Sequence, residues 1–166
     1  MRLLALLALL ALTAPAAHAK RFQGHGPFGL GVGIGEPTAV TGKLFLGDAP
    51  ALQFGASWSF RREWLALYAD YLHHMWRHIP SLAGGQIQVP WYVGIGGLVL
   101  LDDDDDGFYD KKDDGAFALG ARVPVGIALA WTNAPIEVFL EVVPHVIVIP
   151  GLHVDFGGQL GARYYF

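Results

Sequence analysis

The chain has 166 residues, no cysteine and a formal net charge of −4, and hydrophobic residues make up 53% of it. This length suits one domain, and the absence of cysteine excludes a fold stabilised by disulfides. The sequence shows no basic stripe of the kind that nucleic-acid binding requires, so we expect no nucleic-acid partner.

Residues 1–19 have the composition of a cleaved secretory signal peptide. They combine Arg2, the apolar run Leu3–Leu12 and a closing Ala17-His18-Ala19, which has the small-x-small pattern of a cleavage site. The apolar run is shorter than the roughly 20 residues that a spanning helix needs. We therefore expect residues 1–19 to be removed and residues 20–166 to form one β-barrel domain.

Apolar residues alternate with small or polar ones along the rest of the chain, which is the period of a β-strand. In Phe28–Gly35 every even position is large and apolar and every odd position is glycine. Pro90, Pro124 and Pro144 indicate a bulge or a strand end where they fall. The predicted strands are Phe28–Gly35, Val40–Leu46, Leu52–Phe60, Leu65–Tyr71, Trp91–Leu101, Phe117–Ile127, Ile136–Val142 and Phe156–Phe166.

Eight strands joined mostly by short connections predict an all-β fold, an eight-stranded antiparallel up-and-down transmembrane β-barrel. This is the smallest common size of bacterial outer-membrane barrel. The apolar faces would then meet lipid, and the minority faces would place three cations against three carboxylates in the lumen. The predicted lumen network consists of Lys43, Asp70, Arg122, Glu137, Glu141 and Arg163.

The C-terminal strand adds a second indication of a membrane barrel. Phe166 ends the chain, and Tyr164 and Leu160 lie on the same predicted face. This pattern resembles the terminal signal by which the barrel-assembly machinery recognises outer-membrane barrels. We therefore expect Leu160, Tyr164 and Phe166 to form such an assembly signal.

Several short motifs recur along the chain after residue 19. They are Gly29–Thr38, Gly42-Lys43, Trp58–Phe60, Tyr68–Leu72, Tyr92–Gly97, Arg122–Gly126, Ala134–Glu141 and Arg163–Phe166. Together these motifs resemble the BAPKO-type small outer-membrane β-barrels, which are OmpA/OmpX-like eight-stranded barrels. The resemblance covers nearly all of the chain after residue 19, and it implies a bacterial outer-membrane location and no common activity.

The acidity of the chain is concentrated in 102–114, which holds eight aspartates and two lysines. The spacing of five of these aspartates, with Gly107 at the sixth position, matches a calcium-binding loop except that a shorter aspartate replaces the last glutamate. The alternative is a solvated acidic loop without a specific site. The candidate calcium ligands are Asp102, Asp104, Asp106, Asp110 and Asp113.

No cofactor other than this candidate calcium ion is indicated. Ser57 and Ser59 lie on the minority face, but no His-x-Ser pair accompanies them, so an enzyme is not expected. We expect a structural or surface-interaction role in the outer membrane, with lipid, the assembly machinery and an extracellular protein as partners. Two alternatives stay open: a membrane-rim enzyme acting on lipid A or phospholipid acyl chains, and a soluble periplasmic barrel binding a small apolar ligand.

Overall fold

The computed structural model describes residues 25–59, 64–76, 79–102 and 117–166. The expected signal peptide and most of the acidic loop lie outside these ranges. Within the described ranges, no helix is long and apolar enough to cross a membrane.

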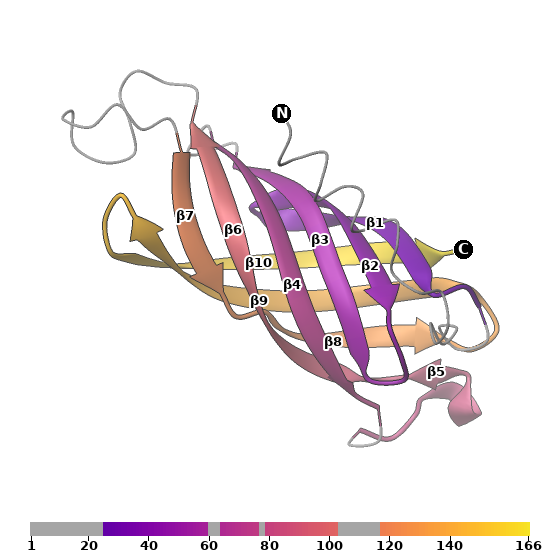
Figure 1. Cartoon of the computed structure of the whole chain (residues 1–166). Coiled ribbons are helices and arrows are strands. Elements are labelled where there is room, and N and C mark those ends of the chain that lie inside the picture. Colours follow the sequence, from indigo (N-terminus) through magenta and orange to yellow (C-terminus); the bar gives the residue numbers. More distant parts are fainter. Residues whose placement is uncertain (1–24, 60–63, 77–78, 103–116) are drawn as a thin grey trace.

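The described residues form antiparallel strands that close into a barrel (Figure 1). β10 pairs with both β9 and β1, and this closes the sheet. β7 and β8 both pair with β6 and β9 and act as one interrupted strand, so the barrel has eight strands, as predicted. The elements are β1 (Phe28–Glu36), β2 (Thr38–Phe45), β3 (Pro50–Ser59), β4 (Trp64–Met75), the 3-10 helix η2 (Ala83–Gly85), β5 (Ile87–Gln88), β6 (Trp91–Asp102), β7 (Phe117–Arg122), β8 (Val125–Trp131), β9 (Ile136–Ile149) and β10 (His153–Tyr165).

The strand registers fix the stagger of the barrel. A path from Gly29 through directly paired residues, strand by strand, reaches Asp155 on β10. Gly29 itself pairs with Tyr165 on the same strand, so the stagger is 165 − 155, or ten residues. With a rise of ~3.3 Å per residue and strands ~4.7 Å apart, this stagger tilts eight strands by about 41°. Side chains can fill an interior of this size.

Several strands extend beyond their predicted bounds, β4 to Met75, β9 to Ile149 and β10 back to His153, and one is interrupted. The sixth predicted strand is interrupted at Val123-Pro124, although the Pro124 carbonyl still accepts the Gly94 N–H at 2.8 Å. Pro144 does not end its strand, because its carbonyl accepts the Val123 N–H at 2.9 Å and β9 continues to Ile149. The β9–β10 connection is therefore a short turn, and β5 is an additional strand that pairs with β8.

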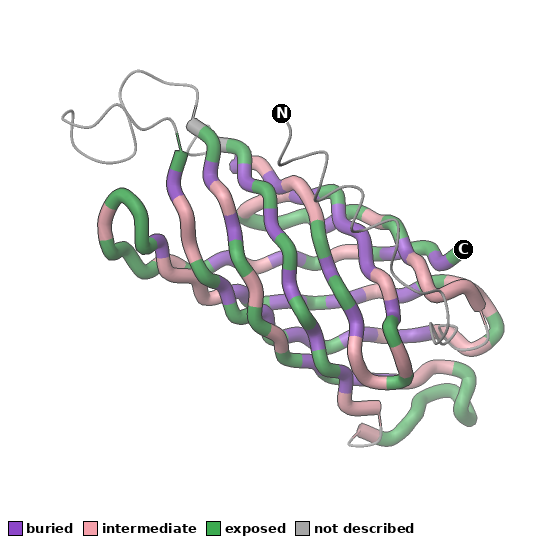
Figure 2. The backbone as a smooth tube through the Cα atoms, in the orientation of Figure 1, coloured by how far each residue is buried: buried purple, intermediate pink, exposed green. Residues whose placement is uncertain are grey.

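Buried and exposed residues alternate along the strands (Figure 2). The outward residues of β1 are exposed, at 44% for Leu30, 54% for Val32 and 73% for Ile34. The lumen is filled in layers: an aromatic cluster including Phe45, Tyr92 and Tyr165 lies toward the C-terminal end of the barrel. The polar lumen residues lie next to this cluster. A second apolar cluster lies toward the opposite end, where β6 ends and β7 begins, and we call this the loop end.

Candidate functional site

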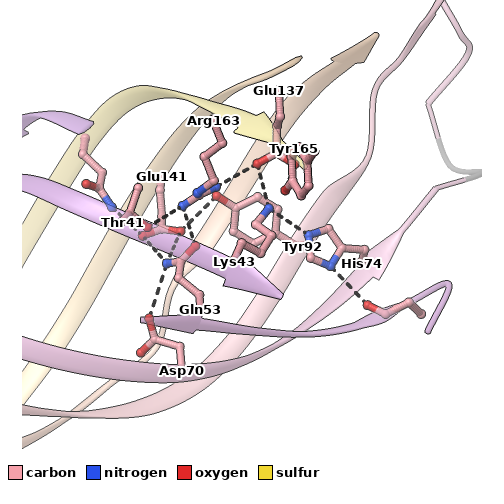
Figure 3. A network of polar contacts seen from close by, with 12 residues as sticks. Thr41, Lys43, Gln53, Asp70, His74, Tyr92, Glu137, Glu141, Arg163 and Tyr165 are labelled. Carbon is pink, nitrogen blue, oxygen red and sulfur yellow. Dashed lines mark hydrogen bonds and ion pairs between the residues drawn. The ribbon is translucent and has the colours of Figure 1, made fainter. Parts of the chain in front are cut away.

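The structure brings the six charged residues proposed for the lumen together inside the barrel. Figure 3 shows Lys43, Asp70, Glu137, Glu141 and Arg163 among them. Strand alternation directs them inward from β2, β4, β7, β9 and β10, and all of them are buried. Three are cations and three are carboxylates, so the set has no formal net charge. Because an isolated charge in such a site costs several kcal/mol, partners are required, and the contacts supply them.

Glu137 is the acceptor for two cations. Its Oε1 lies 2.8 Å from Lys43 Nζ and 2.7 Å from Arg163 Nη1. The Tyr165 hydroxyl donates to Oε2 at 3.2 Å. Arg163 and Glu137 are directly paired residues on β10 and β9, so the backbone register itself sets this contact.

Glu141 is the second centre of the network. It accepts hydrogen bonds from the Tyr92 hydroxyl at 2.9 Å and from the side-chain amides of Gln53 and Gln159 at 3.1 Å and 3.0 Å. Arg122 Nη2 lies 3.5 Å from it. Each of these four groups therefore donates a hydrogen bond to the carboxylate or carries a positive charge.

The Arg122 guanidinium connects Glu141 to Asp70. Arg122 Nε lies 3.0 Å from Asp70 Oδ1, although the geometry is that of an ion pair and not of a directed hydrogen bond. The two carboxylates therefore flank Arg122 and compensate its charge.

Gln53 joins the two centres. Its carbonyl accepts from Arg163 Nη2 at 2.7 Å, while its amide donates to Glu141. The network extends toward the C-terminal end through Lys43 Nζ, which lies 3.2 Å from His74 Nε2. His74 Nδ1 in turn lies 3.1 Å from the Ala49 carbonyl, so Nδ1 carries the proton and Nε2 accepts from Lys43. The polar contacts thus run from the middle of the lumen to the β2–β3 turn.

The glycines of β1 make room for large inward side chains of β10. A Cβ at Gly29 would lie 2.8 Å from the Tyr165 ring, and one at Gly33 would meet Gln159 Oε1. A Cβ at Gly31 would meet the Ala162 carbonyl of the neighbouring backbone. The alternation of glycine with large apolar residues therefore provides the space that Gln159 and Tyr165 occupy.

A small cavity lies between the network and the apolar cluster of the loop end. The centre of a water molecule can reach about 30 Å³ of it. Its polar lining comes from Ser57, Tyr68, Arg122, His145 and Gln159. His145 Nδ1 lies 3.3 Å from the Val143 carbonyl.

Sequence reasoning missed part of this site. Sequence analysis did not assign Gln53, Tyr92 or Gln159 to the network, although all three fall on the predicted inward face. The structure adds Thr41 and His74 to the network as well. Their position on the inward face was the feature of the sequence that could have identified them. Which inward residues meet across the lumen depends on the barrel stagger, which periodicity does not reveal.

The remaining candidate residues lie elsewhere. Leu160, Tyr164 and Phe166 are on the outer face, exposed by at least half, and the Tyr164 and Phe166 ring centroids are 5.1 Å apart. Their recognition by assembly machinery stays a prediction. Asp102 ends β6, and the other candidate calcium ligands Asp104, Asp106, Asp110 and Asp113 lie outside the described residues.

Comparison with protein-family models, curated proteins and solved structures finds no match for the chain. What the structure establishes is an eight-stranded antiparallel barrel with an apolar outer surface and a charge-balanced, hydrogen-bonded interior.

Proposed function

We propose that this barrel spans the bacterial outer membrane after signal-peptide cleavage and has a structural or surface-interaction role without enzymatic activity. The observation that carries the proposal is the assignment of faces. Lys43, Glu137 and Glu141 are fully buried in the lumen, whereas the outward side chains are predominantly apolar and exposed.

The exposed apolar surface is too extensive for an ordinary water-soluble monomer. Thirty large hydrophobic residues are exposed among the described residues, and they occur on every strand of the barrel wall. Soluble monomers rarely expose contiguous apolar patches larger than a few hundred Å². A soluble barrel that binds an apolar ligand would have the opposite arrangement, with apolar residues inside and charged residues outside.

The proposed orientation follows from the topology. β1 begins and β10 ends at the same end of the barrel. Placing this end in the periplasm puts the first, third, fifth and seventh connections outside the cell. β6 ends and β7 begins at the end opposite the C-terminus (Figure 1), so the acidic segment belongs to the fifth connection. The acidic segment would then face the outside of the cell, where an extracellular protein or a calcium ion could reach it, and the outward residues would contact outer-membrane lipid.

Membrane fractionation of cells that express the full chain tests this proposal. We expect recovery in the outer membrane, a processed N-terminus after residue 19, and faster gel migration of the unboiled protein than of the boiled protein. A Gly31→Pro variant, which removes a donor inside β1, serves as the misfolded control and should lose the heat-dependent shift. Recovery as a soluble periplasmic protein would contradict the proposal.

A further inference from the structure

One edge of β10 has no neighbouring strand at the loop end. β10 pairs with β9 back to His153, whereas its pairing with β1 reaches only Gly158, which lies opposite Glu36. Among the described residues, 153–157 therefore pair on one side only, and the β9–β10 hairpin extends past the end of β1 (Figure 1). Such an edge offers backbone N–H and C=O groups with which another strand can pair.

The hydrogen bonds of β10 identify the backbone groups that this edge offers. The Phe166 N–H donates to the Phe28 carbonyl on the β1 side, and the Tyr165 N–H donates to the Pro135 carbonyl on the β9 side. Neither strand pairing of β10 has a register shift. Even-numbered residues of β10 therefore direct their backbone groups toward β1, and odd-numbered residues direct theirs toward β9. The unpaired edge consequently presents the backbone groups of Val154 and Phe156.

The outward side chains at this edge are apolar. Leu152, Val154 and Phe156 are 81%, 57% and 70% exposed. With a rise of ~3.3 Å per residue and a tilt of about 41°, the ~25 Å apolar band of an outer-membrane barrel spans about ten residues of a strand. Counted back from Phe166, this length ends near Phe156. In a membrane, Val154 and Leu152 would therefore lie beyond the band, where a bound protein would remove them from water.

Asp155 favours a strand with a positive charge. It stands between Val154 and Phe156, and its Oδ1 accepts the Phe156 N–H at 2.8 Å. On the unpaired side Asp155 occupies a non-hydrogen-bonded position, where directly opposite side chains come closest. Because a carboxylate has several acceptor sites, a lysine or arginine opposite Asp155 adds a favourable cross-strand pair, whereas an acidic residue there is repelled. The β6–β7 connection at the same end carries the negative charge of 102–114, which attracts a cationic partner.

A second copy of this chain does not suit the edge. Two identical antiparallel strands in one sheet are related by a twofold axis perpendicular to that sheet. In the wall of a membrane barrel this axis lies in the plane of the membrane, so the second barrel would be upside down. A strand from a different protein meets no such restriction.

From these observations we infer that the loop-end edge of β10 binds an extended segment of an extracellular protein in which a basic residue stands between two apolar residues. The segment adds an antiparallel strand beside β10. Its backbone pairs with Val154 and Phe156, and its basic side chain lies opposite Asp155. The inference rests on the proposed function for the location of this edge outside the cell.

Titration of the folded, detergent-solubilised full chain with a synthetic peptide tests the inference. The probe is the acetylated and amidated peptide TVRVT, and the matched control is TVEVT, which has the same apolar residues and the opposite charge. NMR of the ¹⁵N-labelled chain follows the backbone amides of β10. We expect millimolar TVRVT to cause saturable shifts at Val154 and Phe156 and to slow hydrogen exchange at the Val154 amide. Exchange at the Asp155 amide, which faces β9, should not change, and TVEVT should cause no saturable shift.

Two positions separate the backbone contact from the charge contact. Val154→Pro removes an N–H that faces the edge and no donor that faces β9, so it should abolish TVRVT binding and keep the heat-dependent gel shift, whereas Val154→Ala should keep both. TVRVT with N-methylated valines makes the same test on the unaltered chain and should not bind. Asp155→Asn should weaken TVRVT binding by about two- to fivefold.

The titration reports on the edge and the fractionation reports on the location, so a failure of one is distinguishable from a failure of the other. Shifts at Val154 and Phe156 that do not saturate with TVRVT would overturn the inference. Equal binding of TVEVT, or of the N-methylated peptide, would overturn it as well.

Discussion

Glu137 holds two buried cations at once, and this makes it the most sensitive residue of the lumen. Glu137→Gln leaves both Lys43 and Arg163 without a charged partner, and we expect it to destabilise the barrel by about 3–5 kcal/mol. Lys43→Met should be milder, because Glu137 keeps its ion pair with Arg163. Urea unfolding in detergent measures both variants. Equal losses for the two variants would contradict the prediction that Glu137 stabilises both cations.

Two glycines of β1 differ in what a methyl group would meet. At Gly31 the obstacle is the Ala162 backbone carbonyl, whereas at Gly33 it is the flexible end of Gln159. Since a side chain can rotate and a paired strand cannot, Gly31→Ala should lower the free energy of unfolding by at least 1 kcal/mol more than Gly33→Ala. The same unfolding assay compares them. The reverse order would contradict this account of the seam between β1 and β10.

At the scale of elements, β10 has two distinct faces with different expected roles. Tyr165 and Arg163 belong to the lumen, and Tyr164 and Phe166 point outward. We predict that Phe166→Ala slows assembly in cells several-fold but changes spontaneous folding into detergent little, because the ring is 66% exposed. Pulse-chase appearance of the heat-modifiable form measures assembly. A matched loss of spontaneous folding would assign Phe166 a packing role instead.

Prolines show how far an element can be predicted from its sequence. Pro124 interrupts its strand, as its missing N–H suggests. Pro144 has the same chemistry but lies inside the fourteen-residue β9, because its carbonyl still pairs and its neighbours supply the other contacts. The chemistry of proline removes one backbone N–H donor wherever it stands. Pairing with the neighbouring strands determines whether the β-strand continues past the proline.

At the scale of the whole molecule, the outer surface should behave according to depth in a bilayer. Leu140 lies near the middle of β9 and is 53% exposed, so Leu140→Arg should cost about 2–4 kcal/mol of folding free energy in lipid vesicles. Val154→Arg, near the β9–β10 turn, should cost about 0–1 kcal/mol. Equilibrium folding into vesicles of defined lipid measures both. Equal and small effects would indicate that water, and not lipid, meets this surface.

The alternation of side chains by itself determined that this chain forms eight strands, and it determined which face of each strand is large and apolar and which is small, polar or charged. This was possible because a strand repeats every two residues, and residues such as Lys43, Glu137 and Arg163 interrupt otherwise apolar segments at that period. Only the tertiary structure decided which of these residues meet. The ten-residue stagger places Gln53 of β3 between Arg163 of β10 and Glu141 of β9. That stagger is a property of strands pairing around a closed circle, and no single strand encodes it.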